Sequence, residues 1–290
     1  MPDTCPPGPP PPDPARRQPD PPRADESVHR EGHCGRPRRG KTPDPPAGPV
    51  FRRRVPGQGH RQSAAAALCA HASIVLPRSA REARILTRGL GVPERKITVV
   101  PPAVDPRTLD ADRSLFTRRV PAERFILADG IGGEPERNIP LLLQALAKIN
   151  HPAVLLLDPV NRSAAAYRSL AAGNPRLHLV DDVAQGSDLY VAAVAAAELV
   201  VDVSLDQAGG LAFSAAAAGA KLVVSRTAGW EEYFASDAEY VEPTSWELMH
   251  HGITTALNAP QGDALRDRIR GECSQATVLA TLERAYRSLS

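Results

Sequence analysis

The chain has 290 residues and a formal net charge of +2, and its 42% of hydrophobic residues suffice for the core of one or two domains. The four cysteines are far apart and form no C-x-x-C pair, so they indicate neither a disulfide framework nor a zinc site, and they fit a reducing compartment. The apolar runs are short and are interrupted by charged residues, so we expect neither a signal peptide nor a membrane span.

Residues 1–61 differ in composition from the rest of the chain. Seventeen of the 30 prolines lie in the first 56 residues, where large apolar side chains are few. Such a segment cannot bury enough surface to offset its chain entropy, so we predict a disordered Pro- and Arg-rich tail with polyproline II character. Its basic charge is dilute, which favours a solvated linker over contact with nucleic acid or a membrane. Its composition also fits a misread segment of a GC-rich gene.

Within this tail, residues 35–42 read GRPRRGKT and match the letters of a phosphate-binding P-loop. A working P-loop requires a buried strand before it and a helix after it. The preceding residues contain little apolar character, and the following PDPPAGP cannot start a helix. We therefore interpret the match as a coincidence.

From residue 63 onward, short apolar runs alternate with longer helical stretches. Residues 73–77 are predicted to form a strand, residues 79–90 a helix capped by Ser79, and residues 97–100 a strand that ends before two prolines. A long polar connection then leads to about residue 124. We take residues 62–119 as a unit preceding the main domain.

Six further strands are predicted in residues 120–262, with helical segments between them. Near-continuous apolar strands separated by helices are typical of a doubly wound parallel sheet, so we predict an α/β, Rossmann-like domain over residues 120–290, its last 28 residues forming one or two packing helices. The predicted strands cover residues 125–128, 153–157, 177–180, 199–203, 222–225 and 240–241.

Two glycine-containing loops follow predicted strands, at residues 129–138 and 204–211. Ligands of doubly wound sheets bind where strands end and helices begin. In the first loop, Asn138 is a candidate N-cap for a helix over residues 139–149, and Arg137 is a candidate clamp for a diphosphate. Adjacent glycines allow a backbone to approach such a ligand closely, although glycine turns also connect strands to helices for purely local reasons.

The order of these segments is similar to that of glycosyltransferase family 4, whose members have the GT-B fold. Residues 91–105, GVPERKITVVPPAVD, resemble the passage between its two domains. The loop ending in Arg137 and Asn138 resembles the family's glycine-rich loop, and residues 204–225 resemble its second donor-binding segment. GWEE at residues 229–232 and YVEP at residues 240–243 follow in the expected order.

This resemblance implies that the C-terminal half binds the nucleotide of an activated sugar. Arg137 would face the donor diphosphate, and Asp206 would be the first acidic position of the family's E-x7-E motif; these two are the catalytic candidates. The donor-binding candidates are Gly130, Gly132, Gly133, Gly209, Gly210, Leu211, Ser214 and Glu232.

The sequence departs from the family in two places. Ser214 stands where the second motif Glu would hold the ribose, and a hydroxyl lacks the charge that grips two sugar hydroxyls. Residues 63–105 match only the end of the family's N-terminal domain, so we expect most of that domain to be missing.

The resemblance implies a retaining transferase that moves a hexose from a nucleotide sugar to a glycan or lipid-linked acceptor, without a metal or other cofactor. Electrostatic stabilisation of the leaving diphosphate would then supply most of the rate. We expect a cytoplasmic location, including the inner face of the membrane, and no nucleic-acid partner. Two alternatives stay open: a catalytically dead nucleotide-binding or interaction module, and an interaction protein that works through the tail.

Overall fold

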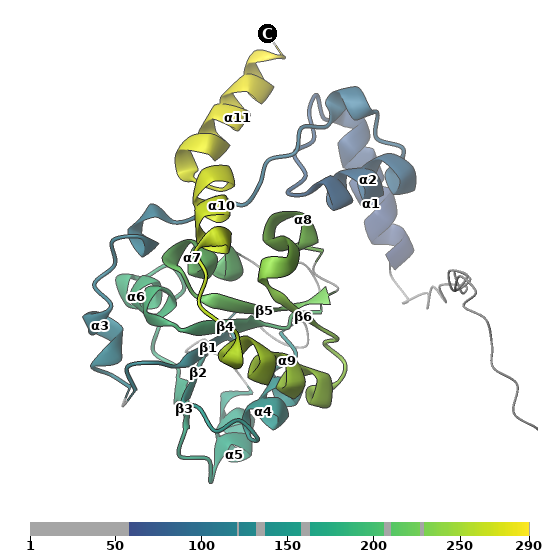
Figure 1. The fold of residues 1–290 in the computed structure, drawn as a ribbon. Coiled ribbons are helices and arrows are strands. Elements are labelled where there is room, and N and C mark those ends of the chain that lie inside the picture. The colour runs from purple at the N-terminus through teal and green to yellow at the C-terminus, as the bar shows by residue number, and fades with distance from the viewer. Residues whose placement is uncertain are drawn as a thin grey trace, which may run out of the picture. The chain divides into compact units, whose positions relative to one another are not determined.

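Six apolar segments of three to five residues form one parallel sheet in the computed structural model (Figure 1). The strand order is β3-β2-β1-β4-β5-β6, so the chain builds outward first on one side of β1 and then on the other. The sheet confirms the predicted α/β, Rossmann-like fold. Its strands are β1 (Ile126–Asp129), β2 (Ala153–Leu156), β3 (Leu177–Val180), β4 (Leu199–Asp202), β5 (Lys221–Ser225) and β6 (Glu239–Val241).

The structure describes residues 58–120, 122–131, 137–157, 163–205, 210–226 and 229–289, with side chains from residue 64. All of them belong to the unit Arg54–Ser290. Residues 1–57 of the predicted disordered tail, including the GRPRRGKT segment, lie outside the described residues, whereas residues 58–61 belong to a helix, α1 (Gln58–His71). The proposed domain boundaries stay predictions.

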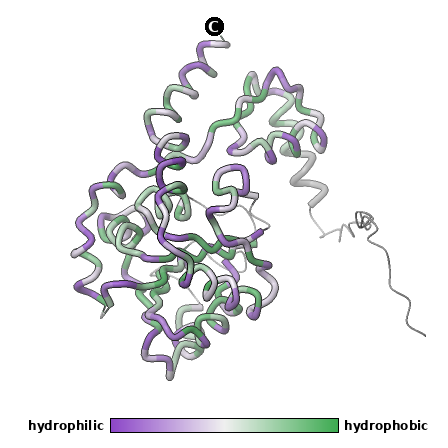
Figure 2. Tube along the Cα trace, in the orientation of Figure 1, coloured by the Kyte–Doolittle hydropathy of each residue, from purple (hydrophilic) through white to green (hydrophobic). Residues whose placement is uncertain are grey.

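Two layers of helices bury the two faces of the sheet. One core contains Leu127 and Val200 and packs against α6 (Asp188–Ala196) and α7 (Leu211–Ala218). The other contains Ile126 and Val201 and packs against the second helical layer. Because successive strand residues point to opposite faces, both faces require apolar residues, and the strands are mostly hydrophobic along their whole length (Figure 2).

The remaining elements are helices and 3₁₀ turns that lie before, between and after the strands in the sequence. The second helical layer consists of α4 (Ile139–Leu146), α5 (Ala164–Ala171) and α9 (Trp246–Asn258). Preceding the sheet are α1 (Gln58–His71), α2 (Ala80–Leu90), η1 (Glu94–Lys96), η2 (Pro106–Thr108) and α3 (Ser114–Thr117). After β5 come α8 (Glu231–Phe234), η4 (Ala235–Asp237), α10 (Ala264–Glu272) and α11 (Gln275–Arg287).

Serine side chains cap four of these helices. Ser79, Ser187, Ser245 and Ser274 each accept a hydrogen bond from the backbone N–H three residues later, at the starts of α2, α6, α9 and α11. Each bond satisfies one of the donors that a helix start leaves free, which is worth about 1 kcal/mol per helix. The predicted Ser79 cap is therefore confirmed.

Aromatic contacts hold α8 against α7. The Phe213 ring of α7 lies 5.0 Å from Trp230, 5.2 Å from Tyr233 and 4.8 Å from Phe234, measured between ring centroids. Contacts of this kind stabilise by more than the area they bury. They fix the short segment that carries Glu232 on the side of the sheet covered by α7.

The two strands predicted at residues 73–77 and 97–100 form only a single parallel bridge, between Val75 and Ile97. Val75 N donates to Lys96 O at 2.6 Å, and Val100 N donates to Pro77 O at 2.8 Å. Pro77 has no N–H to return, which ends the ladder on that side. The prediction of two full strands was wrong in extent, although the pairing itself forms.

Helix α4 ends earlier than predicted, at Leu146. The next residues tighten into shorter turns, with Lys148 N donating to Ala145 O and Ile149 N donating to Leu146 O. A proline follows His151, and the residue before a proline is disfavoured in helical conformation. The two C-terminal helices form as predicted, with Leu265, Ile269 and Val278 buried. Throughout the described part of the chain, every helix is too short or too polar to cross a bilayer.

Gly252 allows α9 to pack closely on β6, which yields a stability prediction. A methyl group added at Gly252 would overlap the side chain of Val241 and lie 3.3 Å from Cγ of Glu239. We expect Gly252→Ala to lower the free energy of unfolding in urea by about 1–3 kcal/mol. Gly89→Ala in α2 is the matched control: its nearest neighbour would lie at 4.0 Å, so it should leave stability unchanged or raise it by up to about 1 kcal/mol. Equal effects of the two changes would contradict the packing argument.

Candidate functional site

The candidate site lies where β1 and β4 run side by side in the middle of the sheet. The two strands are paired in parallel from Ile126 opposite Leu199 to Ala128 opposite Val201. After β1 the chain turns to α4 in one helical layer, whereas after β4 it turns to α7 in the other. The two connections therefore lead to opposite faces of the sheet, and such a switch point is where ligands of doubly wound sheets bind.

Three of the sequence-predicted residues meet at the start of α7. Gly210 is the N-cap residue, Leu211 is buried in the first turn, and Ser214 is half-buried one turn further on. They line a cavity of about 210 Å³ together with Tyr190 of α6 and Asp105. Free backbone N–H groups at such a helix start favour a negatively charged ligand.

The two described glycines among the predicted residues have different roles. A methyl group on Gly130 would lie 2.9 Å from Leu157 Cδ2 and 3.0 Å from the carbonyl oxygen of Leu156, so this glycine is required by packing against β2. A methyl group on Gly210 would meet no atom of the described residues within 4 Å, and Gly210 has φ −73°, which any residue adopts. The described residues give a reason for a glycine at 130 and none at 210.

Four of the predicted site residues lie outside the described residues, so their roles stay predictions: Asp206, Gly132, Gly133 and Gly209.

Arg137 is half-buried and lies close enough to the end of β1 for its charge to lower the pKa of Asp129. Asn138 occupies the N-cap position of α4 in a left-handed conformation, with φ 55°. Its side chain makes no capping bond there and instead donates a hydrogen bond to the carbonyl oxygen of Pro243.

Glu232 is placed differently from the other donor-binding candidates. Its carboxylate accepts hydrogen bonds from the backbone N–H of Ala80 at 2.8 and 3.1 Å, and therefore caps the start of α2. The neighbouring Tyr233 hydroxyl donates to the carbonyl oxygen of Arg78 at 2.6 Å, and the Arg78 guanidinium lies over the Trp230 ring. Glu232 is not among the residues that line the cavity at α7, so its donor-binding role stays a prediction.

A pair of buried acids at the switch point was missed by the sequence reasoning. Asp129 is the last residue of β1 and Asp202 the last of β4, and each is 7% exposed. Both follow a residue that faces the α4 and α9 layer, so both side chains point toward the α6 and α7 layer. The register carries them into adjacent positions on neighbouring strands. The sequence did contain a signal for this pair, because an aspartate ends each of two apolar runs. Carboxylates are rarely buried without a reason.

Asp129 is held from two directions. One carboxylate oxygen accepts from the backbone N–H of Ile131 at 2.8 Å, and the other accepts from the Tyr190 hydroxyl at 3.1 Å. Burial raises the pKa of Asp129 to about 6 and outweighs these bonds and the nearby charge of Arg137, both of which lower it, while the charge of Asp202 raises it further. Asp202 accepts from its neighbour Ser204, whose hydroxyl lies 2.6 Å away.

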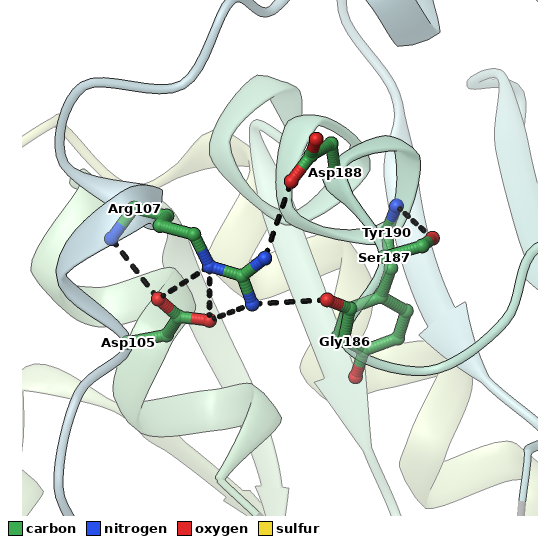
Figure 3. Close-up of polar contacts among 6 residues, drawn as sticks. All are labelled: Asp105, Arg107, Gly186, Ser187, Asp188 and Tyr190. Atoms are coloured by element: carbon green, nitrogen blue, oxygen red, sulfur yellow. Dashed lines mark hydrogen bonds and ion pairs between the residues drawn. The ribbon is translucent and has the colours of Figure 1, made fainter.

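The start of α6, which carries Tyr190, is tied to the segment before the sheet (Figure 3). The Arg107 guanidinium bonds to the Asp105 carboxylate at 2.6 Å, to the carbonyl oxygen of Gly186 at 2.9 Å and to Asp188 at 3.2 Å. The hydrogen bonds from Arg107 lower the pKa of Asp105. Arg107 is half-exposed, so we assign it an orienting role with a small stabilising effect.

The described residues contain no group of three His, Cys, Asp or Glu side chains arranged to hold a metal ion. A nucleotide or another small anion is the ligand class that the α7 start and Arg137 would accept, whereas the two buried acids oppose a negative charge. The site therefore combines attractive and repulsive groups for such a ligand.

Comparisons with known proteins identify structural neighbours. A scan against protein-family models finds no match, and a search of curated proteins finds none. Among solved structures, the chain is similar to a sucrose-phosphate synthase from Thermosynechococcus elongatus, with TM-score 0.66, 19% identity, and coverage of 80% of this chain and 62% of that one. It is also similar to a glycosyltransferase from Rickettsia africae, with TM-score 0.65, 15% identity, and coverage of 81% and 68%.

A third neighbour is the Anabaena protein HepE in complex with UDP and glucose, with TM-score 0.67 and 16% identity; the match covers 79% of this chain and 67% of that one. The chain thus spans about two thirds of the length of these proteins, and at these identities the likeness establishes the fold. Structural neighbours of the chain include glycosyltransferases.

The burial of Asp129 predicts a pH-dependent stability. Its pKa is about 6 in the folded state and close to 3.8 when unfolded, so the folded state binds the proton more tightly. The stability from this group is therefore full below pH 4 and is lost as the pH rises through 6, by about 3 kcal/mol. We expect Asp129→Asn to remove this loss, so that the difference in unfolding free energy between variant and wild type grows between pH 4 and pH 7 in urea titrations.

The control for this experiment is Asp182→Asn. A hydrogen bond from Arg119 lowers the pKa of Asp182, so its contribution to stability is lost as the pH falls, in the opposite direction. A difference between wild type and Asp129→Asn that does not change between pH 4 and pH 7 would contradict a raised pKa.

Proposed function

We propose that this chain contains the donor-binding half of a GT-B-type glycosyltransferase. The observation that carries the proposal is the meeting of Gly210, Leu211 and Ser214 at a cavity beside the β1–β4 switch point. It is supported by the likeness to structures that include a glycosyltransferase and a protein holding UDP and glucose. The ligand is then a nucleotide sugar, with its diphosphate at the start of α7.

In this proposal Arg137 neutralises charge on the diphosphate, and backbone N–H groups at the start of α7 donate to its oxygens. As the bond from the sugar to the phosphate breaks, negative charge grows on the leaving diphosphate, and these groups stabilise it. Asp206 is the candidate for the first acidic position of the E-x7-E motif. A hexose would pass with retention to a glycan or lipid-linked acceptor, without a metal, in the cytoplasm or at the inner face of the membrane.

A catalytically inactive nucleotide-binding module is the second candidate. Ser214 favours it, because the side chain facing the cavity is a hydroxyl where a carboxylate would bind two sugar hydroxyls. The two candidates share the binding site and differ in turnover.

The open space at Gly210 gives a direct test of ligand approach. We expect Gly210→Ala to weaken binding of UDP-glucose, measured by calorimetry on the full chain, by roughly tenfold, which corresponds to about 1.4 kcal/mol. Its free energy of unfolding should stay within about 0.5 kcal/mol of the wild type, because the added methyl group meets no atom in the part of the chain that the structure describes.

Gly130→Ala is the matched comparison. Its methyl group would lie too close to the Leu156 carbonyl oxygen and the Leu157 side chain, so it should lower the free energy of unfolding. The proposal fails if no nucleotide sugar from a panel of UDP, GDP and ADP sugars binds the wild type. It also fails if Gly210→Ala binds as well as the wild type.

Ser214→Glu separates a donor site that has lost a contact from a pocket that is not used. We expect the added carboxylate to raise the affinity for UDP-glucose several-fold, because it can accept hydrogen bonds from two sugar hydroxyls. Release of UDP from UDP-glucose by wild type and variant reports turnover in the same samples. Tighter binding without turnover supports the inactive module, and unchanged affinity contradicts a donor role for this position.

A further inference from the structure

The acid pair at the switch point conflicts with a negatively charged ligand. The proposed function brings a nucleotide diphosphate to the carboxyl ends of β1 and β4, where Asp129 and Asp202 are each 7% exposed. Like charges repel strongly where water is excluded, because the interior screens them far less than bulk solvent. Holding a bound anion beside two ionised carboxylates would therefore cost free energy, and protonation of one carboxylate lowers this cost.

The surroundings of Asp129 identify it as the group that can take this proton. From α6 the Tyr190 hydroxyl reaches one oxygen at 3.1 Å, and from the following turn the N–H of Ile131 reaches the other at 2.8 Å. Among the described residues, the charged groups whose fields reach it are Asp202 on β4 and Arg137 before α4, and β2 contributes the apolar Leu156 beside it. Burial already raises the pKa of Asp129 to about 6, so little further energy is needed to protonate it near neutral pH.

A proton on Asp129 would also have a hydrogen-bond acceptor. The protonated oxygen can donate to the Tyr190 hydroxyl, which turns from donor to acceptor, while the N–H of Ile131 keeps its bond to the other oxygen. The ring of Tyr190 lines the same cavity as Gly210 and Ser214. Asp129 is thus connected to the cavity through one hydrogen bond.

We propose that binding of a nucleoside diphosphate sugar is coupled to uptake of one proton from solvent by Asp129, which is released when the nucleotide leaves. This inference rests on the proposed function, because it concerns the same site. Asp129 acts here as a positioning residue whose charge sets the affinity for the diphosphate.

The coupling has a definite sign. Since the protonated form favours the anion, affinity for the nucleotide sugar rises as the pH falls, by roughly five- to twenty-five-fold between pH 8 and pH 6 if the bound state holds the proton one to two pH units more tightly. At pH 7 the wild type then takes up roughly 0.4 to 0.8 of a proton per nucleotide sugar bound. Asp129→Asn is neutral at every pH and should bind without this dependence.

Calorimetry of the full chain with UDP-glucose measures the uptake directly. At pH 7, titrations in two buffers with different ionisation enthalpies give the number of protons exchanged, and the affinity is followed from pH 5.5 to pH 8. UDP-glucose is the probe because both ends of its diphosphate are esterified, so the nucleotide itself does not titrate near neutrality. Asp110→Asn, the same change at an exposed aspartate outside the site, is the control and should behave like the wild type.

Tyr190→Phe is a second variant, which keeps the carboxyl group of Asp129. Loss of the hydroxyl donor removes a bond that favours the ionised carboxylate, so the free protein is more protonated at pH 7 and the uptake on binding falls. A merely structural role of Tyr190 would alter affinity at all pH values and leave the proton count unchanged.

The outcomes separate this inference from the proposed function. Binding of UDP-glucose with no proton uptake, or with uptake that persists in Asp129→Asn, would overturn the inference and leave the proposed function standing. Absence of binding by the whole panel of nucleotide sugars from pH 5.5 to pH 8 would overturn both. Uptake that is present in the wild type and in Asp110→Asn, reduced in Tyr190→Phe and lost in Asp129→Asn would establish it.

Discussion

The hydrogen bonds between β1 and β4 join the two halves of the sheet, and the candidate site depends on this pairing. The chain enters α4 in one helical layer after β1 and α7 in the other layer after β4, so the two connections lead to opposite faces of the sheet. Parallel strands end at the same edge, which brings Gly130, the start of α7 and both terminal aspartates to one place. A different strand order would scatter the same residues along the edge of the sheet.

Burial of both sheet faces explains why polar groups at this edge have unusual properties. Asp129 and Asp202 end strands whose earlier residues are all within the core, and both are 7% exposed. For Asp129, desolvation shifts the pKa more than any single hydrogen bond does. The positive groups nearby, Arg137 and the start of α7, face a site whose net charge changes with one proton.

The residues that the family resemblance placed together as donor-binding candidates have separate physical roles in the structure. Gly130 is a packing glycine, Gly210 is open to solvent, and Glu232 caps α2 across the boundary with the preceding segment. Through Glu232, Tyr233 and Arg78, the segment before the sheet is attached to α8, and α8 is attached to α7 by aromatic contacts.

By itself, the sequence determined the six strands, their parallel arrangement and the two loops that reach the ligand edge, because hydrophobic period and glycine placement are local properties. It also identified Gly210, Leu211 and Ser214, which lie in one helix start. Only the tertiary structure decided that Gly130 is needed for packing, that Glu232 caps a helix 152 residues away in sequence, and that Asp129 and Asp202 are buried neighbours. These properties arise from contacts between segments distant in the chain, and a local pattern carries no information about which distant atoms will surround a residue.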